Sequence, residues 1–202
     1  MAIQFQSTTL REQVANHLRN RILRGDFQPG EKINEVEVAR QLNISRGPVR
    51  EALRQIEQEG SVSYTTNKGC TVTTLSPEEM AEFYLLRSTL ETLAVRVFDG
   101  KMRPGTVRLL QQKCEELHAA AQDEDLPAIV SIDQEFHGAI VLEAGLPILY
   151  KTWSSFDGGN AAIYYTLHSS HLLPSPRYLK DNHQVIIHPF KAGDWEDAIP
   201  TT

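Results

Sequence analysis

The sequence predicts a mainly α-helical chain of two domains, a small N-terminal unit over residues 1–75 and an all-helical bundle over residues 76–202. Apolar residues recur at helical spacing in most segments, while one stretch, residues 61–75, is rich in Val, Thr and Tyr. A helix-start signal at Ser76 then opens a region that is helical throughout. With 202 residues, 41% of them hydrophobic, the chain can bury a sizeable core.

The first expected helix covers residues 10–24, with an apolar stripe and a cap at Thr8 or Thr9. The turn "GDFQPG" (25–30) ends it, because Gly and Pro interrupt helices. A short helix follows over residues 35–42, with four residues available for burial: Val36, Val38, Ala39 and Leu42. The next helix begins after a tight turn, which gives a helix-turn-helix.

The helix in "SRGPVREALRQIEQEG" (45–60) carries two different stripes. Ser45 is a suitable N-cap, and Pro48 lies in the first turn, where its missing N–H costs no hydrogen bond. Three arginines follow one another at i+4, on a different arc from the apolar stripe: Arg46, Arg50 and Arg54. The spacing therefore predicts an arginine face exposed to solvent.

Residues 61–75, "SVSYTTNKGCTVTTL", predict a β-hairpin around an Asn-Lys-Gly turn that contains Lys68 and Gly69. From Ser76 the box "SPEE" starts the second domain. The helices expected there cover residues 77–99, 104–121, 126–143, 147–168 and 176–191.

Charge is divided unevenly between the domains. Residues 1–75 hold 10 Lys and Arg against 8 Asp and Glu, whereas residues 76–202 hold 10 against 18. Such asymmetry suggests a nucleic-acid-binding module joined to an acidic domain. Cys70 and Cys114 are isolated in the sequence, outside any paired-cysteine motif. Because the sequence has no apolar run of 18 residues and no signal-peptide pattern, we expect a cytoplasmic protein without a membrane partner.

Three helices followed by a hairpin make a winged helix-turn-helix, and DNA is the anion that suits the arginine face. We expect Ser45, Arg46, Arg50 and Arg54 to contact DNA, where Arg can bond guanine O6 and N7 together. Gly47 lets the backbone approach the duplex, and the wing contributes two further residues, Lys68 and Gly69. The alternative is a solvated basic face paired with three nearby acids: Glu51, Glu57 and Glu59.

At these residues the chain resembles the GntR-type bacterial transcription regulators, in particular the FadR-like subfamily with a helical C-terminal FCD domain. The resemblance rests on "VANHLRNRILRGDFQPGEKINEVEVARQLNISRGPVREALRQIEQEGSV" and "NKGCTV", and continues in "EFYLLRSTLETLAVRVF" and "IDQEFHGAIVLEAGLPIL". It implies a homodimer that binds an inverted-repeat operator and responds to a small-molecule effector. Many relatives have Thr at the position of Gly47, which puts base preference in doubt.

Asp133 and His137 stand at i and i+4, so both side chains share one helix face and can coordinate one divalent metal such as Zn, Mn or Ni. The resemblance implies His183 as a third ligand. It also implies a fourth His on a final helix, but the chain ends at Thr202, after "KAGDWEDAIPTT". A truncated or frameshifted coding sequence, a shortened functional domain, and a replacement ligand at His168 or His171 stay open.

Arg87 and Tyr84 are the residues we expect to bind the effector, which a guanidinium beside a metal would favour as a small organic acid. An ion pair from Arg87 to Glu91 at i+4 is the alternative role. Tyr164 and Tyr165 are further candidates for the same cavity.

Two rival functions follow from the same residues. A metal-dependent hydrolase would use an Asp-His-His site with an open position, but no general base, nucleophile elbow or phosphate loop accompanies the site. A DNA-binding protein that acts without an effector is the other. The sequence favours an effector-responsive DNA-binding regulator over both, and not an enzyme.

Overall fold

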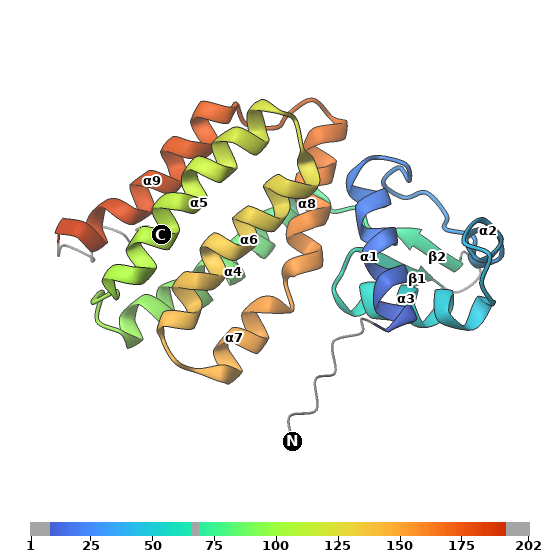
Figure 1. The fold of residues 1–202 in the computed structure, drawn as a ribbon, viewed down its shortest axis with the longest axis horizontal. Coiled ribbons are helices and arrows are strands. Elements are labelled where there is room, and N and C mark those ends of the chain that lie inside the picture. The colour runs from blue at the N-terminus through green and yellow to red at the C-terminus, as the bar shows by residue number, and fades with distance from the viewer. Residues whose placement is uncertain (1–8, 66–68, 193–202) are drawn as a thin grey trace, which may run out of the picture. The chain divides into compact units, whose positions relative to one another are not determined.

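The computed structural model describes residues 9–65 and 69–192, and the chain divides into two compact units between Thr74 and Leu75 (Figure 1). Each unit has the architecture that the sequence predicts. The first is a three-helix unit with a two-stranded wing, and the second is a helical bundle. The predicted fold class is confirmed.

The first unit contains α1 (Leu10–Leu23), α2 (Glu35–Gln41) and α3 (Arg46–Gln58), followed by β1 (Val62–Thr65) and β2 (Gly69–Val72). The strands pair antiparallel, with Val62 opposite Val72 and Thr65 opposite Gly69. Lys32, before α2, forms a further bridge to Thr71 of β2. The hairpin therefore has a third backbone segment along one edge.

The core of this unit is the face of α3 opposite its arginines. Val49, Leu53 and Ile56 have no exposed surface, and α1 covers them with Leu18, which is also fully buried. Such close packing holds α3 in one orientation. The short helix α2 contributes only Val38 and Ala39 to this core, because a helix of two turns buries a single face. Val36, which we expected to be available for burial, is 52% exposed.

The second unit is built around α6 (Leu126–Glu143), which packs against helices on several sides. These are α4 (Pro77–Val97), α5 (Pro104–Gln122), α7 (Pro147–Ser154) and α8 (Asp157–Ser169). The last helix, α9 (Pro176–Ala192), lies along α5 (Figure 1). Within the described residues, no helix has the length and apolar character needed to cross a membrane.

One helix of the sequence prediction is wrong. The segment 147–168 forms two helices, α7 and α8, separated at Ser155 and Phe156. Serine and the Gly158–Gly159 pair have low helix propensity, and Asp157 supplies the acidic residue that favours a new helix start. The other predicted helix ends agree with the structure or differ from it by one or two residues. In the sequence, Asp194 as N-cap and Trp195 to Ala198 as a first turn would start a further helix, but these residues lie outside the described ones.

A long-range contact fixes the start of α5. Arg103 is its N-cap residue, and its backbone N–H donates to Glu143 Oε1 at 2.7 Å. The Arg103 guanidinium donates to both oxygens of the same carboxylate, and Thr106 Oγ1 donates to Oε2 at 2.8 Å. Burial alone would raise the pKa of Glu143, but these donors outweigh it and lower the pKa.

We expect Glu143→Gln to lower the free energy of unfolding by about 1–2 kcal/mol at pH 7, since it weakens several hydrogen bonds to a charged acceptor. A carboxyl with a depressed pKa stabilises the fold above the unfolded pKa near 4.3 and loses that effect as pH falls through the folded value. Chemical denaturation from pH 7 to pH 3 should show the two proteins converging in acid. Glu82→Gln, at an exposed position on α4, is the control; an equal loss in both variants would contradict the contact's role.

Candidate functional site

The arginine face of α3 is exposed. The side chains of Arg46, Arg50 and Arg54 are 57%, 56% and 57% accessible. Long cationic side chains on a helix that is anchored by its other face can reach an external anion without unfolding anything. The site residues we expected on α3 are therefore accessible, as a DNA contact requires.

These arginines do not stand alone, because Glu35 of α2 faces them. Arg50 Nε donates to Glu35 Oε2 at 3.2 Å, and Arg46 Nη2 lies 3.7 Å from the same oxygen. The hydroxyl of Tyr64, on β1, donates to the other oxygen, Oε1, at 3.0 Å. One carboxylate therefore connects α2, α3 and the wing.

Arg54 ties the wing to α3 by a second route. Its guanidinium carbon lies 4.0 Å from the centre of the Tyr64 ring, and Nη1 donates to Glu57 Oε2 at 2.8 Å. Glu57 Oε1 accepts the Tyr64 backbone N–H at 3.1 Å. Of the acids weighed as partners of the arginine face, Glu57 pairs with it, whereas Glu59 binds Arg19 of α1 through two hydrogen bonds.

The remaining residues of the expected interface differ in how far the structure describes them. Ser45 is the N-cap of α3, although its side chain makes no capping hydrogen bond. A Cβ atom on Gly47 would meet nothing within 4 Å, so the backbone there is open to an approaching molecule. Gly69 begins β2 with a φ of +82°, a conformation that favours glycine. Lys68 lies outside the described residues.

Lys32 is a basic residue that the sequence did not single out. It lines an open cavity of about 490 Å³ together with the three arginines of α3, Glu35 and Tyr64. The backbone bridge between Lys32 and Thr71 places Lys32 beside the arginines. No local sequence pattern predicts this pairing.

The second candidate site lies inside the helical unit and centres on Asp133 of α6, which is 4% exposed. Its Oδ2 accepts from Arg87 Nη2 at 3.1 Å and from Asn160 Nδ2 at 3.0 Å. Its Oδ1 accepts from the Tyr164 hydroxyl at 2.9 Å and lies 3.2 Å from His183 Nε2. A buried carboxylate requires such partners.

The two histidines have a defined orientation. His183 Nδ1 lies 2.7 Å from the carbonyl oxygen of Leu179, and His137 Nδ1 lies 2.9 Å from Glu91 Oε2. Both partners are acceptors, so each Nδ1 carries a hydrogen, and each Nε2 is turned toward Asp133 Oδ1. Donation from the distal ring nitrogen to a carbonyl or carboxylate is the usual support of a metal-binding histidine.

The charge of this cluster also matters. Burial alone would raise the pKa of Asp133, but His137, His183 and Arg87 outweigh it and hold the pKa well below its usual range. The pKa of Glu91 is lowered against burial in the same way, by His137 and Arg87. Arg87 is the permanent cation bonded to both carboxyl groups, so the cluster can take up further positive charge, either as protons on the histidines or as a bound metal ion.

The residues fit a divalent metal ion. One ligand atom each of Asp133, His137 and His183 lies within 4.8 Å of the others. In the neutral form of each histidine, Nε2 is an acceptor like Oδ1 of Asp133, so a proton or a metal ion between these atoms would join them. Within the described residues this is the one such group of three or more. His168 and His171 instead line a separate cavity with residues such as Leu179, so they are not its replacement ligands here.

Arg87 is 5% exposed, and each of its guanidinium nitrogens bonds within the protein. Nε donates to Glu91 at 3.0 Å, Nη1 to Asn160 at 2.6 Å and Nη2 to Asp133. The ion pair to Glu91, weighed from the sequence, is thus present. Tyr84, its proposed companion, is 44% exposed on the same helix.

Sequence reasoning missed two members of this network. Trp153 of α7 donates Nε1–H to Glu91 Oε1 at 2.9 Å, and Asn160 of α8 joins Arg87 to Asp133. Both belong to the segment that was expected to be one continuous helix. Their distances in sequence from Glu91 and Asp133 left no local signal.

Comparisons with known proteins identify the family of each unit. The sequence matches the family model for bacterial regulatory proteins of the gntR family over residues 10–72 and the model for the FCD domain over residues 82–199. An HTH-type transcriptional regulator from the TAR-I ttuE-ttuC' intergenic region of Agrobacterium vitis is 34% identical over 67% of this chain and 81% of its own length. The regulator YdhC of Bacillus subtilis is 32% identical over 64% of this chain, which spans 58% of that relative.

Solved structures show the same architecture. McbR/YncC of E. coli has a TM-score of 0.74 and 25% identity over 95% of this chain and 91% of its own. A GntR regulator from Rhodococcus sp. RHA1 has a TM-score of 0.76 and 25% identity over 93% of this chain and 89% of its own.

We expect Arg87→Met to lower the free energy of unfolding by about 3–5 kcal/mol, because it leaves two buried carboxylates without their permanent cation. The control is Arg177→Met, whose side chain is 89% exposed and lies 3.5 Å from Asp181; this change should stay within about 0.5 kcal/mol. Urea denaturation of metal-free protein measures both. Similar stability of the two variants would show that the cluster does not need the Arg87 charge.

Proposed function

We propose that this chain, which belongs to the GntR family of bacterial regulatory proteins and carries an FCD domain, regulates transcription by binding an operator and responding to a small molecule. The family is one of regulators and not of enzymes, which excludes the hydrolase considered above. The finer parts of the proposal are the DNA-contacting residues, the dimer, the metal and the class of effector.

The observation that carries the proposal is the exposed arginine face of α3, held by a fully buried opposite face. A helix of this kind can lie in the major groove with its N-terminal turn against base edges. Arg46 and Arg50 stand on its first turns, where they would contact bases or phosphates, and Arg54 stands beside the wing. Lys68 and Gly69 would extend the contact to the adjacent backbone.

A homodimer on an inverted repeat follows from the size of this element. One recognition helix reads only a few base pairs, and two copies related by a twofold axis read a palindrome. The α4 helix supports the idea, because it exposes four large apolar side chains: Leu85, Leu86, Leu93 and Val97. Apolar residues gathered on one helix are typical of an interface.

For the second unit we propose a divalent metal, Zn, Mn or Ni, held by Asp133, His137 and His183. When bound, the metal would supply a positive charge that attracts an anionic ligand, so a small organic acid is the proposed effector. Glu91 and the Leu179 carbonyl would orient the two histidines. Arg87 and Tyr84 would help to bind the acid, Arg87 through guanidinium hydrogens left by its internal bonds.

The DNA-binding face can be tested with Arg46→Ala on an operator selected from random duplexes by the wild-type chain. If Arg46 bonds a guanine, specific affinity should fall by about 1–3 kcal/mol with a smaller loss on random DNA. Arg108→Ala, at an exposed position on α5, is the charge-matched control. Fluorescence anisotropy at fixed salt measures both; unchanged affinity for every duplex would remove α3 from the DNA.

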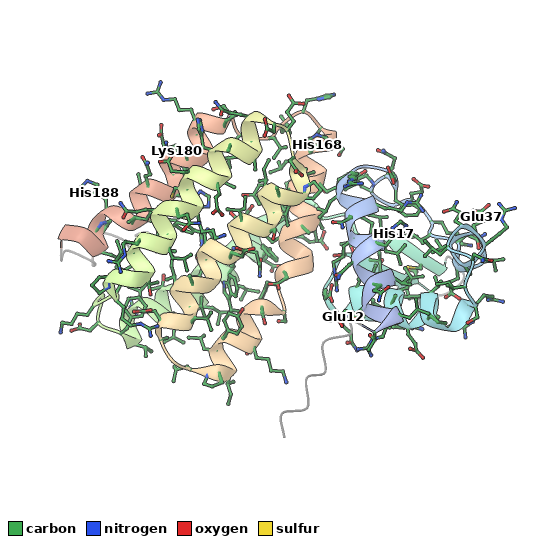
Figure 2. The ribbon with its side chains drawn as sticks, viewed as in Figure 1. Glu12, His17, Glu37, His168, Lys180 and His188 are labelled. Carbon is green, nitrogen blue, oxygen red and sulfur yellow. The ribbon has the colours of Figure 1, made fainter. Side chains whose placement is uncertain are left out.

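The metal centre can be tested by thermal melting of chelator-treated protein with added Zn²⁺, Mn²⁺ or Ni²⁺. A metal at 100 times its dissociation constant should stabilise the fold by about 2.7 kcal/mol. His137→Ala and His183→Ala should abolish the shift, whereas His17→Ala, at an exposed position on α1, should retain it (Figure 2). A melt indifferent to all three metals would rule out the proposed centre.

A further inference from the structure

Glu35 is an acid in the middle of a basic surface. It lines the same open cavity as Lys32, Arg46, Arg50 and Arg54. A carboxylate here weakens the attraction of the surface for phosphate, since every contact with DNA depends on those cations. A residue that opposes binding in this way requires a compensating role.

Glu35 is more firmly held than the arginines it binds. Its side chain is 18% exposed, against 56% and 57% for Arg50 and Arg46. The Tyr64 hydroxyl bonds Oε1, and burial raises the pKa of Tyr64, so the phenol stays protonated and donates. Asn34, the residue before it, caps α2 through bonds to the backbone N–H groups of Val36 and Glu37. Glu35 is therefore the more buried partner of each ion pair, and Tyr64 holds it in place from the wing.

The hydrogen bond between Glu35 and Arg50 leaves both terminal amino groups of Arg50 able to bind a base. Arg50 uses Nε to reach Glu35, so its two terminal amino groups remain for a bidentate contact. Such a pair of donors matches guanine O6 and N7. Restraining the guanidinium before binding reduces the conformational entropy that the contact must overcome.

We propose that Glu35 is a positioning residue for DNA specificity: it holds Arg50, and more weakly Arg46, toward the bases and away from the phosphates. This inference rests on the proposed DNA-binding function. A duplex with the matching base can bond the oriented Arg50 side chain. A duplex without that base gains no such bond and is repelled by the negative charge of Glu35. Glu35 thus lowers affinity for all DNA and lowers it most for DNA without the operator sequence.

The test compares Glu35→Gln with Glu37→Gln in the full-length chain. Glu37 lies in the same first turn of α2, is exposed, and points away from the helix (Figure 2). Both substitutions remove one negative charge near the same helix end. The probes are an operator selected from random duplexes by the wild-type chain and a scrambled duplex of equal length, with anisotropy recorded at several salt concentrations.

Both variants should bind the scrambled duplex more tightly than wild type by a similar factor. Only Glu35→Gln should lose discrimination, with the ratio of operator to scrambled affinity falling roughly 5- to 150-fold, the range of one bidentate base contact. Tyr64→Phe changes no charge and keeps the ring under Arg54, so it should lower the ratio by a smaller factor while leaving scrambled binding unchanged. Glu35→Asp should restore part of the ratio.

Circular dichroism melting of each variant separates positioning from folding. If Glu35→Gln lowers affinity for both duplexes in step with its melting temperature, the residue is structural and the inference is wrong. Equal ratios in Glu35→Gln and Glu37→Gln also overturn it, and show that only charge matters. If the wild-type chain selects no sequence at all, the proposed function fails, and this inference fails with it.

Discussion

The helical unit depends on one buried carboxylate. Asp133 contacts groups on three other helices: it accepts hydrogen bonds from Arg87 on α4 and from Asn160 and Tyr164 on α8, and its Oδ1 lies 3.2 Å from His183 Nε2 on α9. An ionised group in a protein interior is tolerated only when such partners surround it, so the positions of these helices are coupled through a single side chain. A small molecule or ion that changes the surroundings of Asp133 would act on all of them at once. Through this coupling, the binding of a ligand near Asp133 can change the packing of several helices.

The winged unit uses the same kind of contact at its surface, with a different energetic balance. Glu35 also joins three elements, but its arginine partners are more than half exposed. Exposed ion pairs contribute little to stability and exchange readily, whereas buried pairs are costly to break. The ion pairs of Glu35 therefore add little to stability, while the pair of Arg87 and Asp133 is costly to break. The difference in burial makes Asp133 the structural one of the two carboxylate centres.

Local patterns in the sequence predicted most of the fold. The apolar stripes gave the helices, the "SPEE" box gave the start of α4, and the i, i+4 spacing placed Asp133 and His137 on one face. The sequence failed where partners are distant. Trp153, Asn160 and Lys32 reach their sites through tertiary packing. The break between α7 and α8 had local signals in Ser155, Asp157 and the two glycines, but the sequence prediction did not use them. His183 was expected only by resemblance, since no spacing rule connects it to a residue 50 positions earlier.

In the proposed metal centre, a cation completes the arrangement around Asp133. Anomalous X-ray diffraction at the zinc edge, from crystals grown with Zn²⁺, can locate that cation. We expect one strong peak about 2.0–2.2 Å from Asp133 Oδ1 and from the Nε2 atoms of His137 and His183, with the Nδ1 contacts to Glu91 and Leu179 retained. Zinc bound elsewhere, with Asp133 still bonded directly to His183, would contradict it.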